Sequence, residues 1–360
     1  MNQPSTGRRR LLQLGAGIAA AALLPRPGFA DVISDAKIVD STQTTSGAKF
    51  KKSGKVRIGF SNGFSGNTWR TECLAAMRIE AAKHPEIADF IVVDGQGDIT
   101  KQVNDIQDLI SQQVDAILCI ANSGTAVAPA LRKAMRAGIA AVPFNLPVEG
   151  EHWDAYIGTD PSKKGARLGA FLHDALGGKG KIVALGGLPG NSYTAAAWAG
   201  AKSALGSGIE VLAFKDAFWQ EDKAKVVMAD LLTAYPEIDG VWCDGGQDAT
   251  GAAEAMLAAG RKLVPMTGDD YNGFLKLYAR EHANQPGFRI GAMSEPSWEG
   301  VVAIRTALKL LAGDSVPKTQ TIEPTLITDA NYQQYIRPDL PDGVFIDTNL
   351  SDAELKKLFH

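Results

Sequence analysis

KVRIGFSNGFSGNTWR, residues 55–70, reads as a short apolar strand, a glycine-rich loop and the first turn of a helix. A dinucleotide-binding domain begins in the same way, but with a G-x-G-x-x-G loop that brings the backbone against a pyrophosphate. Here Gly59, Gly63 and Gly66 have a different spacing, the bulky Trp69 follows them, and no Gly-Lys-Ser/Thr sequence is present. The stretch therefore predicts a strand–loop–helix unit whose loop serves a ligand other than a phosphate.

The chain beyond this unit alternates apolar, strand-like runs with helical patterns. Ile99, Val103 and Ile106, for example, share one face of a predicted helix. Continuous apolar runs of four to six residues are typical of strands buried on both faces of a parallel sheet. The strand-like runs fall into two successive series along the chain. These series predict an α/β fold of two doubly wound parallel-sheet lobes. The expected strands are 56–60, 90–93, 116–120 and 139–144, then 182–185, 209–214, 240–243, 263–267 and 289–293.

Polar and aromatic side chains gather where these strands end. In open parallel sheets the ligand crevice lies beyond the carboxyl ends of the strands, so these residues are candidates for one site. Indole faces suit the C–H faces of a sugar, and carboxylates and amides suit its hydroxyls. The alternative is that the two tryptophans are core residues and that Asp269 caps a helix. The candidates are Ser61, Asn67, Trp69, Arg70, Asn145, Trp219, Asp244, Gln247, Asp269, Ser294 and Glu295, with Arg70 as the only cation.

Residues 1–30 carry the pattern of a cleaved export signal. Arg8, Arg9 and Arg10 precede two leucines, and an apolar run too short to span a bilayer ends at a small-residue site before Asp31. The adjacent arginines favour a twin-arginine signal over an ordinary Sec signal. No cysteine follows the predicted cleavage site, which argues against a lipid anchor. We expect a periplasmic protein with no membrane insertion, in which residues 31–54 form a flexible lead-in.

Charge and composition exclude several classes of partner. The 37 basic residues less the four arginines of residues 1–30 leave 33, against 40 acidic residues, a net charge of −7 for the exported chain. This balance argues against binding of nucleic acid. The three cysteines, Cys73, Cys119 and Cys243, lie in apolar patterns and are expected as buried thiols. The five histidines show no ligand spacing, so neither a metal nor a cofactor is expected.

Six stretches between about Lys55 and Ile327 are distinctive: VRIGFSN (56–62), VDGQGDITKQVNDIQDLI (93–110), AILCIANSGTAVAPAL (116–131), YIGTDPSKKGARLG (156–169), LLTAYPEIDGVW (231–242) and MTGDDYNGF (266–274). On these stretches the chain resembles a bacterial ABC-transporter solute-binding protein of the ribose/galactose type. The resemblance implies two lobes joined by three hinge strands, a sugar bound between them, delivery to a membrane permease by a monomer, and no catalysis. The lobes would comprise 55–159 with 295–322 and 160–294 with 323–345, followed by a tail, 346–360.

The resemblance also implies roles for individual residues. Trp69 and Trp219 match the stacking aromatics of the two lobes, Asn67 matches a loop amide and Asp269 a lobe 2 carboxylate. The sequence departs from the family elsewhere: Asn145–Leu146 stands for an Asp–Arg pair, Ala197 for an arginine, Gly245 for an amide and Ser294 for the hinge glutamine. These departures argue against ribose itself as the ligand. Another pentose, a furanose sugar, a deoxy sugar or a polyol remains as the expected ligand, with Arg70 compensating for the lost arginines.

Two other functions fit parts of the sequence. An exported oxidoreductase would suit a twin-arginine signal, but the nucleotide fingerprint and any base–nucleophile pair are missing. A ligand sensor for signalling on the same fold would carry a similar site. Residues 331–360 extend beyond the resemblance, and the sequence assigns them no function.

Overall fold

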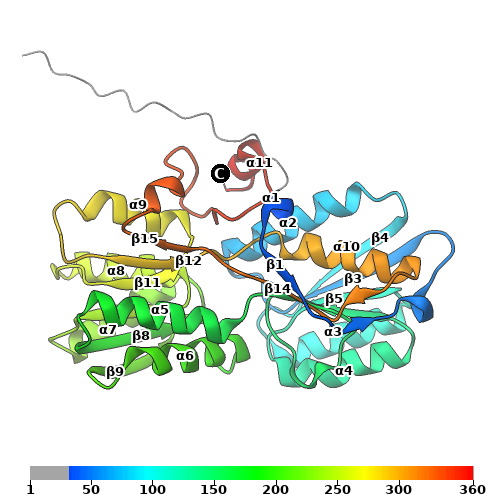
Figure 1. The fold of residues 1–360 in the computed structure, drawn as a ribbon, viewed down its shortest axis with the longest axis horizontal. Coiled ribbons are helices and arrows are strands. Elements are labelled where there is room, and N and C mark those ends of the chain that lie inside the picture. Colours follow the sequence, from blue (N-terminus) through cyan, green and yellow to red (C-terminus); the bar gives the residue numbers. More distant parts are fainter. Residues whose placement is uncertain (1–31, 360) are drawn as a thin grey trace, which may run out of the picture.

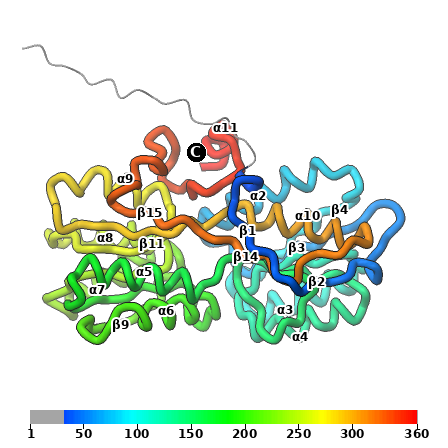
Figure 2. Tube along the Cα trace, in the orientation of Figure 1, coloured from blue at the N-terminus to red at the C-terminus, as the bar shows by residue number. Residues whose placement is uncertain are grey.

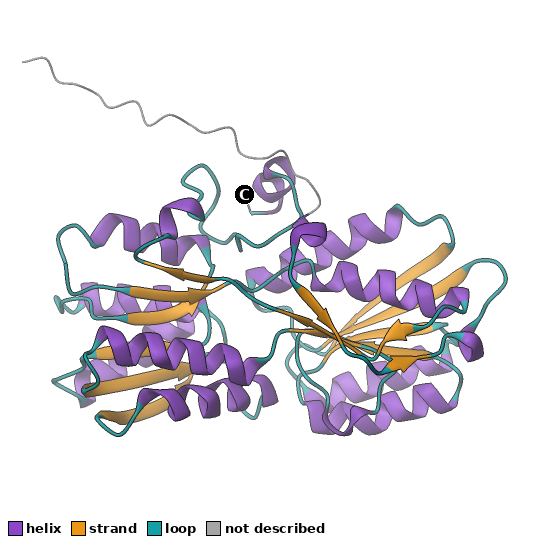
Figure 3. Cartoon of the chain, in the orientation of Figure 1, coloured by secondary structure: helices purple, strands orange, loops and turns teal. Residues whose placement is uncertain are grey.

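The computed structural model describes residues 32–359, so the predicted export signal lies outside the described residues. Lobe 1 is built on a four-stranded parallel sheet in the order β4-β3-β5-β6 (Figure 1). Helices cover both of its faces (Figure 3). The strands are β3 (Val56–Asn62), β4 (Ile87–Asp94), β5 (Ala116–Ile120) and β6 (Ala140–Pro143), and the helices are α2 (Thr68–Ala82), α3 (Ile99–Ser111), α4 (Gly124–Arg136) and α10 (Glu299–Ala312).

Lobe 2 contains a six-stranded sheet in the order β15-β12-β11-β10-β8-β9, parallel except for β15. The predicted architecture of two parallel-sheet lobes is thus confirmed. The apolar runs explain it, because β10, β11 and β12 are buried along their whole length. The strands are β8 (Gly180–Gly186), β9 (Ile209–Asp216), β10 (Gly240–Cys243), β11 (Met266–Asp269), β12 (Ile290–Met293) and β15 (Leu326–Thr328), and the helices are α5 (Pro161–Ala175), α6 (Ser192–Leu205), α7 (Glu221–Ala234), α8 (Gly246–Ala258) and α9 (Asn272–Glu281).

The chain passes between the two sheets at three places. These crossings follow β7 (Tyr156–Gly158), β12 and β14 (Thr319–Ile322). β14 pairs in parallel with β7 and then leads into β15 of lobe 2, and Figure 1 shows it running across the junction. The predicted lobe limits stay predictions, but three separate connections give the lobes a hinge about which they can open and close.

Residues 32–54 differ from the flexible lead-in expected for residues 31–54. They contain the short helix α1 (Val32–Asp35), strands β1 (Ile38–Asp40) and β2 (Thr44–Thr45), and the 3₁₀ turn η1 (Ala48–Phe50). β1 pairs antiparallel with the hinge strand β14, and β2 pairs with β13 (Val316–Pro317). Phe50 is completely buried. The polar composition was misleading because pairing of the backbone with strand edges, and not side-chain burial, orders most of this segment.

The C-terminal residues return to the junction between the lobes (Figure 2). After β15 the chain forms η3 (Tyr332–Gln334) and ends in α11 (Asp352–Leu358), which contacts α2 of lobe 1. Within residues 32–359, no helix combines the length and apolar character needed to span a bilayer. Cys73, Cys119 and Cys243 are buried and free, as predicted.

Candidate functional site

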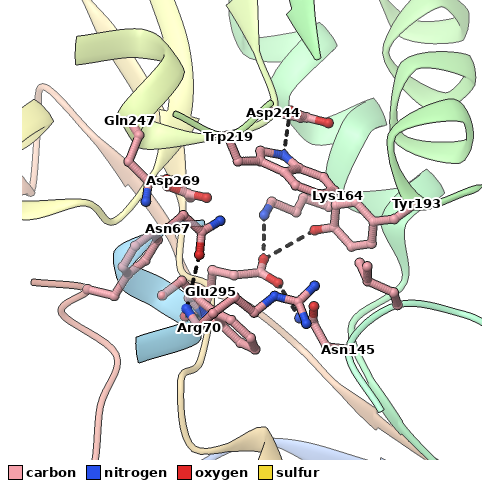
Figure 4. Close-up of a pocket in the computed structure, with 13 residues that line it drawn as sticks. Asn67, Arg70, Asn145, Lys164, Tyr193, Trp219, Asp244, Gln247, Asp269 and Glu295 are labelled. Carbon is pink, nitrogen blue, oxygen red and sulfur yellow. Dashed lines mark hydrogen bonds and ion pairs between the residues drawn. The ribbon is translucent and has the colours of Figure 1, made fainter. Parts of the chain in front are cut away.

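A pocket lies between the lobes, at the carboxyl ends of their strands (Figure 4). Every sequence-predicted candidate except Ser61 and Ser294 lines it. Four further residues line it that the sequence analysis did not name as candidates: Leu146, Lys164, Tyr193 and Phe345. The full lining is Asn67, Trp69, Arg70, Asn145, Leu146, Lys164, Tyr193, Trp219, Asp244, Gln247, Asp269, Glu295 and Phe345.

The lobe 1 wall is set by the start of α2. The Asn67 side chain caps this helix by accepting a hydrogen bond from the Arg70 backbone N–H at 3.0 Å. The cap places Trp69 and Arg70 in the first turn, facing the pocket. Trp69 Nε1 donates to the carbonyl of Glu295 at 3.0 Å, and Arg70 Nη1 donates to Asn62 Oδ1 at 2.9 Å. Both side chains are buried and held in one orientation, and burial lowers the pKa of Arg70 to about 10.

The indole of Trp219 forms part of the lobe 2 wall. Its Nε1 donates to Asp244 Oδ1 at 3.0 Å, and the Tyr193 ring meets it edge-on with centroids 6.3 Å apart. Phe218 and Trp219 have positive φ angles of 67° and 53°, which is costly for bulky residues and typical of ligand sites. A Cβ at Gly187 would lie 2.1 Å from the Trp219 ring. The lack of a side chain at Gly187 therefore leaves room for this indole.

The glycine loop of the opening stretch meets the other lobe. The carbonyl of Gly66 accepts a hydrogen bond from Gln220 Nε2 at 2.9 Å, so lobe 2 contacts the loop directly. Gln247 Nε2 donates to Thr68 Oγ1 at 3.3 Å, and Asn191 Nδ2 donates to the carbonyl of Asn122 at 3.1 Å. These hydrogen bonds between lobes define the described state as closed.

Two carboxyl groups of lobe 2, those of Asp244 and Asp269, line the pocket. Asp269 Oδ1 accepts from the Gly246 N–H at 2.5 Å, and Asp244 Oδ2 is buried without a partner. Burial raises the pKa of Asp269 to about 7, with nearby Lys164 opposing the rise and Glu295 adding to it. Burial likewise raises the pKa of Asp244 to about 6. A ligand that donates hydroxyl hydrogens to these groups compensates for their lost hydration.

A buried ion pair crosses the middle of the pocket. Lys164 Nζ, from the first turn of α5, lies 2.5 Å from Glu295 Oε2, and their side chains are 1% and 9% exposed. The Glu295 carboxylate also accepts from Asn145 Nδ2 at 2.9 Å and from Tyr193 O–H at 3.2 Å. Burial opposes the charge of Lys164, but Glu295 outweighs this effect and the pKa of Lys164 rises well above its usual value.

Three expectations about this site need correction. Ser61 is buried beside Gln102, whose Nε2 donates to its Oγ at 3.3 Å, because the Ser61 side chain points from β3 into lobe 1. Ser294 Oγ instead accepts from the Thr325 N–H at 3.0 Å and joins two hinge segments. Arg70 is not the only cation, because Lys164 enters the site from a helix. The sequence alone does not distinguish Lys164 from the adjacent Lys163, whose side chain is 81% exposed.

Two parallel-sheet lobes, joined by three crossings and closed over a polar and aromatic pocket at their strand ends, define a type I periplasmic binding protein of the sugar-binding kind. The chain belongs to the family described as periplasmic binding protein domain, whose model matches residues 58–315.

Named relatives and solved structures share this fold. The ribose import binding protein of Bacillus subtilis (strain 168) is 29% identical over 231 residues, 64% of this chain and 73% of the relative. The xylitol-binding protein of Mycolicibacterium smegmatis is 32% identical over 176 residues, 48% of this chain and 50% of the relative. An ABC-transporter solute-binding protein from Mycobacterium smegmatis with bound glycerol has a TM-score of 0.70 and 27% identity, covering 79% of this chain and 98% of that structure.

Proposed function

We propose that this protein is the periplasmic substrate-binding component of a sugar ABC transporter, which binds a neutral monosaccharide or polyol between its lobes and delivers it to a membrane permease. One observation carries the proposal: Trp69 of lobe 1 and Trp219 of lobe 2 line the same pocket as Asp244 and Asp269. Indole faces and paired acceptors suit a compact guest with many hydroxyls. The protein is exported by its twin-arginine signal, acts as a monomer and catalyses no reaction.

The mechanism that we propose is closure about the hinge. Trp69, Asn67 and Arg70 are fixed on lobe 1, whereas Trp219 and Asp269 are fixed on lobe 2. A ligand can use both sets of groups only when the lobes are closed, so its differential affinity shifts the population toward the closed state. The permease then recognises this closed form.

The ligand class follows from the lining and from the relatives. Relatives are named for ribose, xylitol and a rhizopine, and similar structures hold glycerol and D-allose. The Glu295 carboxylate already accepts hydrogen bonds from Asn145, Lys164 and Tyr193. The hydrogen-bond acceptors left for a ligand are therefore mainly Asp244 and Asp269. We propose a pentose, a furanose sugar, a deoxy sugar or a small polyol.

A thermal-shift screen tests the proposed function directly. Pentoses, hexoses, furanose sugars, deoxy sugars and polyols are added separately, and at least one is expected to raise the melting temperature in a saturable way, because a ligand stabilises only the folded state that binds it. Titration calorimetry then gives the affinity. A screen in which none of these compounds shifts the transition, and in which a nicotinamide nucleotide does, would favour the oxidoreductase alternative.

Trp69→Ala is expected to weaken the binding of the best ligand by about 30-fold or more, because the stacking surface of lobe 1 and its water-excluding face are lost. Calorimetry on Trp69→Ala and Trp69→Phe measures the effect, and the phenyl ring should restore part of the affinity. Trp198→Ala removes a partly buried indole from α6 outside the pocket and serves as the control. Near-normal affinity in Trp69→Ala would remove this residue from the site.

Ligand affinity should rise with pH up to about 8. Hydroxyl donors stabilise the ionised carboxylates, whereas the empty site holds Asp269 with a pKa of about 7 and Asp244 with a pKa of about 6. Below these values binding must expel protons, so the affinity falls as the pH decreases. Calorimetry at pH 5.5 and 8 in buffers of different ionisation enthalpy measures the released protons. Equal affinities and no proton release would contradict the assigned role of the two carboxylates.

A further inference from the structure

The C-terminal strap, defined here as residues 343–348, places an aromatic side chain in the pocket. The Phe345 ring lines the pocket together with Trp69 and Trp219, and only 1% of the residue is exposed. The family model ends at residue 315, so this part of the lining comes from chain outside the matched region. Figure 2 shows the C-terminal chain lying over the junction between the lobes.

Both lobes hold the strap through buried carboxylates. The Phe345 N–H donates to Glu72 Oε2 on α2 of lobe 1 at 3.0 Å. Two residues further on, the Asp347 N–H donates to Asp270 Oδ2, directly after β11 of lobe 2, at 2.7 Å. Glu72 and Asp270 are 0% and 1% exposed, so these hydrogen bonds are shielded from water. The strap is therefore a further connection between the lobes, besides the three crossings.

The strap is also coupled to the ion pair of the pocket. Asp270 Oδ1 accepts from the Glu295 N–H at 2.8 Å, so one carboxylate holds both the strap and the backbone of the residue that pairs with Lys164. Glu72 Oε1 accepts from Ser297 Oγ at 2.9 Å, on the same crossing after β12. The side chains of Glu72 and Asp270 therefore fix the positions of the strap and of the crossing after β12 relative to the pocket.

The orientation of the Phe345 ring is fixed by a neighbour from lobe 2. It meets the ring of Tyr271 edge-on, with centroids 5.7 Å apart and planes at 61°. Residues 271 and 345 also form an antiparallel backbone bridge. A phenyl ring held in this way offers a ligand apolar contact and no hydrogen bond. A ligand hydroxyl turned toward the ring would lose its hydrogen bonds to water and gain none from the protein.

We propose that Phe345 is a specificity-determining residue of the ligand pocket, positioned by Glu72 and Asp270. It selects a sugar or polyol that presents C–H groups, and no additional hydroxymethyl group, toward the strap. The inference rests on the proposed function and adds the residue that limits ligand size and polarity at the junction of the lobes.

The experiment compares two matched ligand pairs by calorimetry: D-ribose with D-allose, and xylitol with D-sorbitol, each pair differing by one hydroxylated carbon. Phe345→Ala is expected to lower the affinity for the shorter ligand of each pair about tenfold or more. The affinity for the longer ligand should fall much less, because the space left by the ring accepts its additional hydroxylated carbon. The selectivity ratio should therefore fall by about fivefold or more. Phe345→Leu, which preserves most of the core volume, should give an intermediate ratio.

Two further variants separate positioning from general stability. Glu72→Ala should reproduce the altered ratio of Phe345→Ala, and Glu72→Gln, which still offers an acceptor to the Phe345 N–H, should restore the ratio of the unaltered protein. Val344→Ala truncates the neighbouring, fully buried residue of the strap, which does not line the pocket, and should leave the ratio unchanged.

The outcomes distinguish this inference from the proposed function. If the unaltered protein binds one of the pairs and the Phe345 variants keep its selectivity ratio, the inference is wrong and the proposed function stands. If Glu72→Ala lowers stability without changing the ratio, the positioning role is wrong. If the unaltered protein binds none of the four probes or any other sugar or polyol of the thermal-shift screen, the proposed function fails, and the inference with it.

Discussion

Asp269→Ala should abolish ligand binding at micromolar concentrations, with a loss of affinity of about 100- to 1000-fold. Asp269 lines the pocket and has one oxygen fixed by the Gly246 N–H, so the other is directed to the ligand by the geometry of the carboxylate. Two charge-assisted hydrogen bonds to hydroxyls, each contributing about 1.5–3 kcal/mol, account for this magnitude. Calorimetry with the best ligand measures the loss, and circular dichroism checks that the variant is folded.

Asp269→Asn should bind the ligand as poorly as Asp269→Ala does, but it should be more stable than the unaltered protein at neutral and alkaline pH. The pKa of Asp269 is raised by burial from an ordinary 3.8 to about 7, so the folded protein holds a proton that the unfolded chain has released. Stability contributed by the protonated form is therefore present at low pH and is lost as the pH rises from about 4 to about 7. The asparagine does not titrate and avoids a penalty on the order of 2–4 kcal/mol.

Urea denaturation of both proteins in the absence of ligand, at pH 4.5 and at pH 8, measures this difference. We expect nearly equal free energies of unfolding at pH 4.5 and a more stable Asp269→Asn at pH 8. A variant that is less stable than the unaltered protein at pH 8 would show that the carboxylate is retained for folding and not for the ligand.

Lys164→Met is expected to lower the free energy of unfolding by about 3–5 kcal/mol, the second of the two largest effects. The substitution leaves the Glu295 carboxylate buried without its cation, and an unpaired buried charge costs far more than the pair contributes. Ligand binding should weaken as well, because Glu295 fixes Asn145 and Tyr193 in the pocket. Chemical denaturation and calorimetry on the same protein measure both effects.

The double variant Lys164→Met with Glu295→Gln should recover most of the stability, since no charge is then left unpaired. Lys163→Met is the matched control, because its side chain is 81% exposed and its pair with Asp160 is worth about 0–1 kcal/mol. If Lys164→Met were no less stable than Lys163→Met, the buried pair would not be the structural centre of the pocket.

The part of the fold predictable from the sequence is the part encoded in local patterns. Continuous apolar runs identified the parallel strands, and the parallel sheets then brought Trp69, Trp219 and Asp269 to one pocket from distant positions. The lead-in was misjudged because β1 is ordered by pairing with β14, almost three hundred positions away in the chain, which no local pattern reveals.

The missed pocket residues have the same explanation. Lys164 lies in a helical first turn that resembles a solvated surface, and only the return of the chain after β12 brings Glu295 to it. Tyr193 lies in the first turn of α6, after a helix cap at Asn191, and donates to Glu295, which follows β12 about a hundred positions further along the chain. Phe345 enters the pocket from the strap, whose backbone donates to Glu72 and Asp270, residues far away in the sequence.

The central claim is that the two lobes close on a single uncharged, polyhydroxylated ligand. A crystal structure of the protein with the tightest ligand from the thermal-shift screen tests it most directly. We predict one ligand between the indoles of Trp69 and Trp219, with its hydroxyls donating to Asp269 and the lobes as close as the Gln220–Gly66 hydrogen bond requires. A ligand bound away from both indoles, or lobes that stay open around it, would contradict the account.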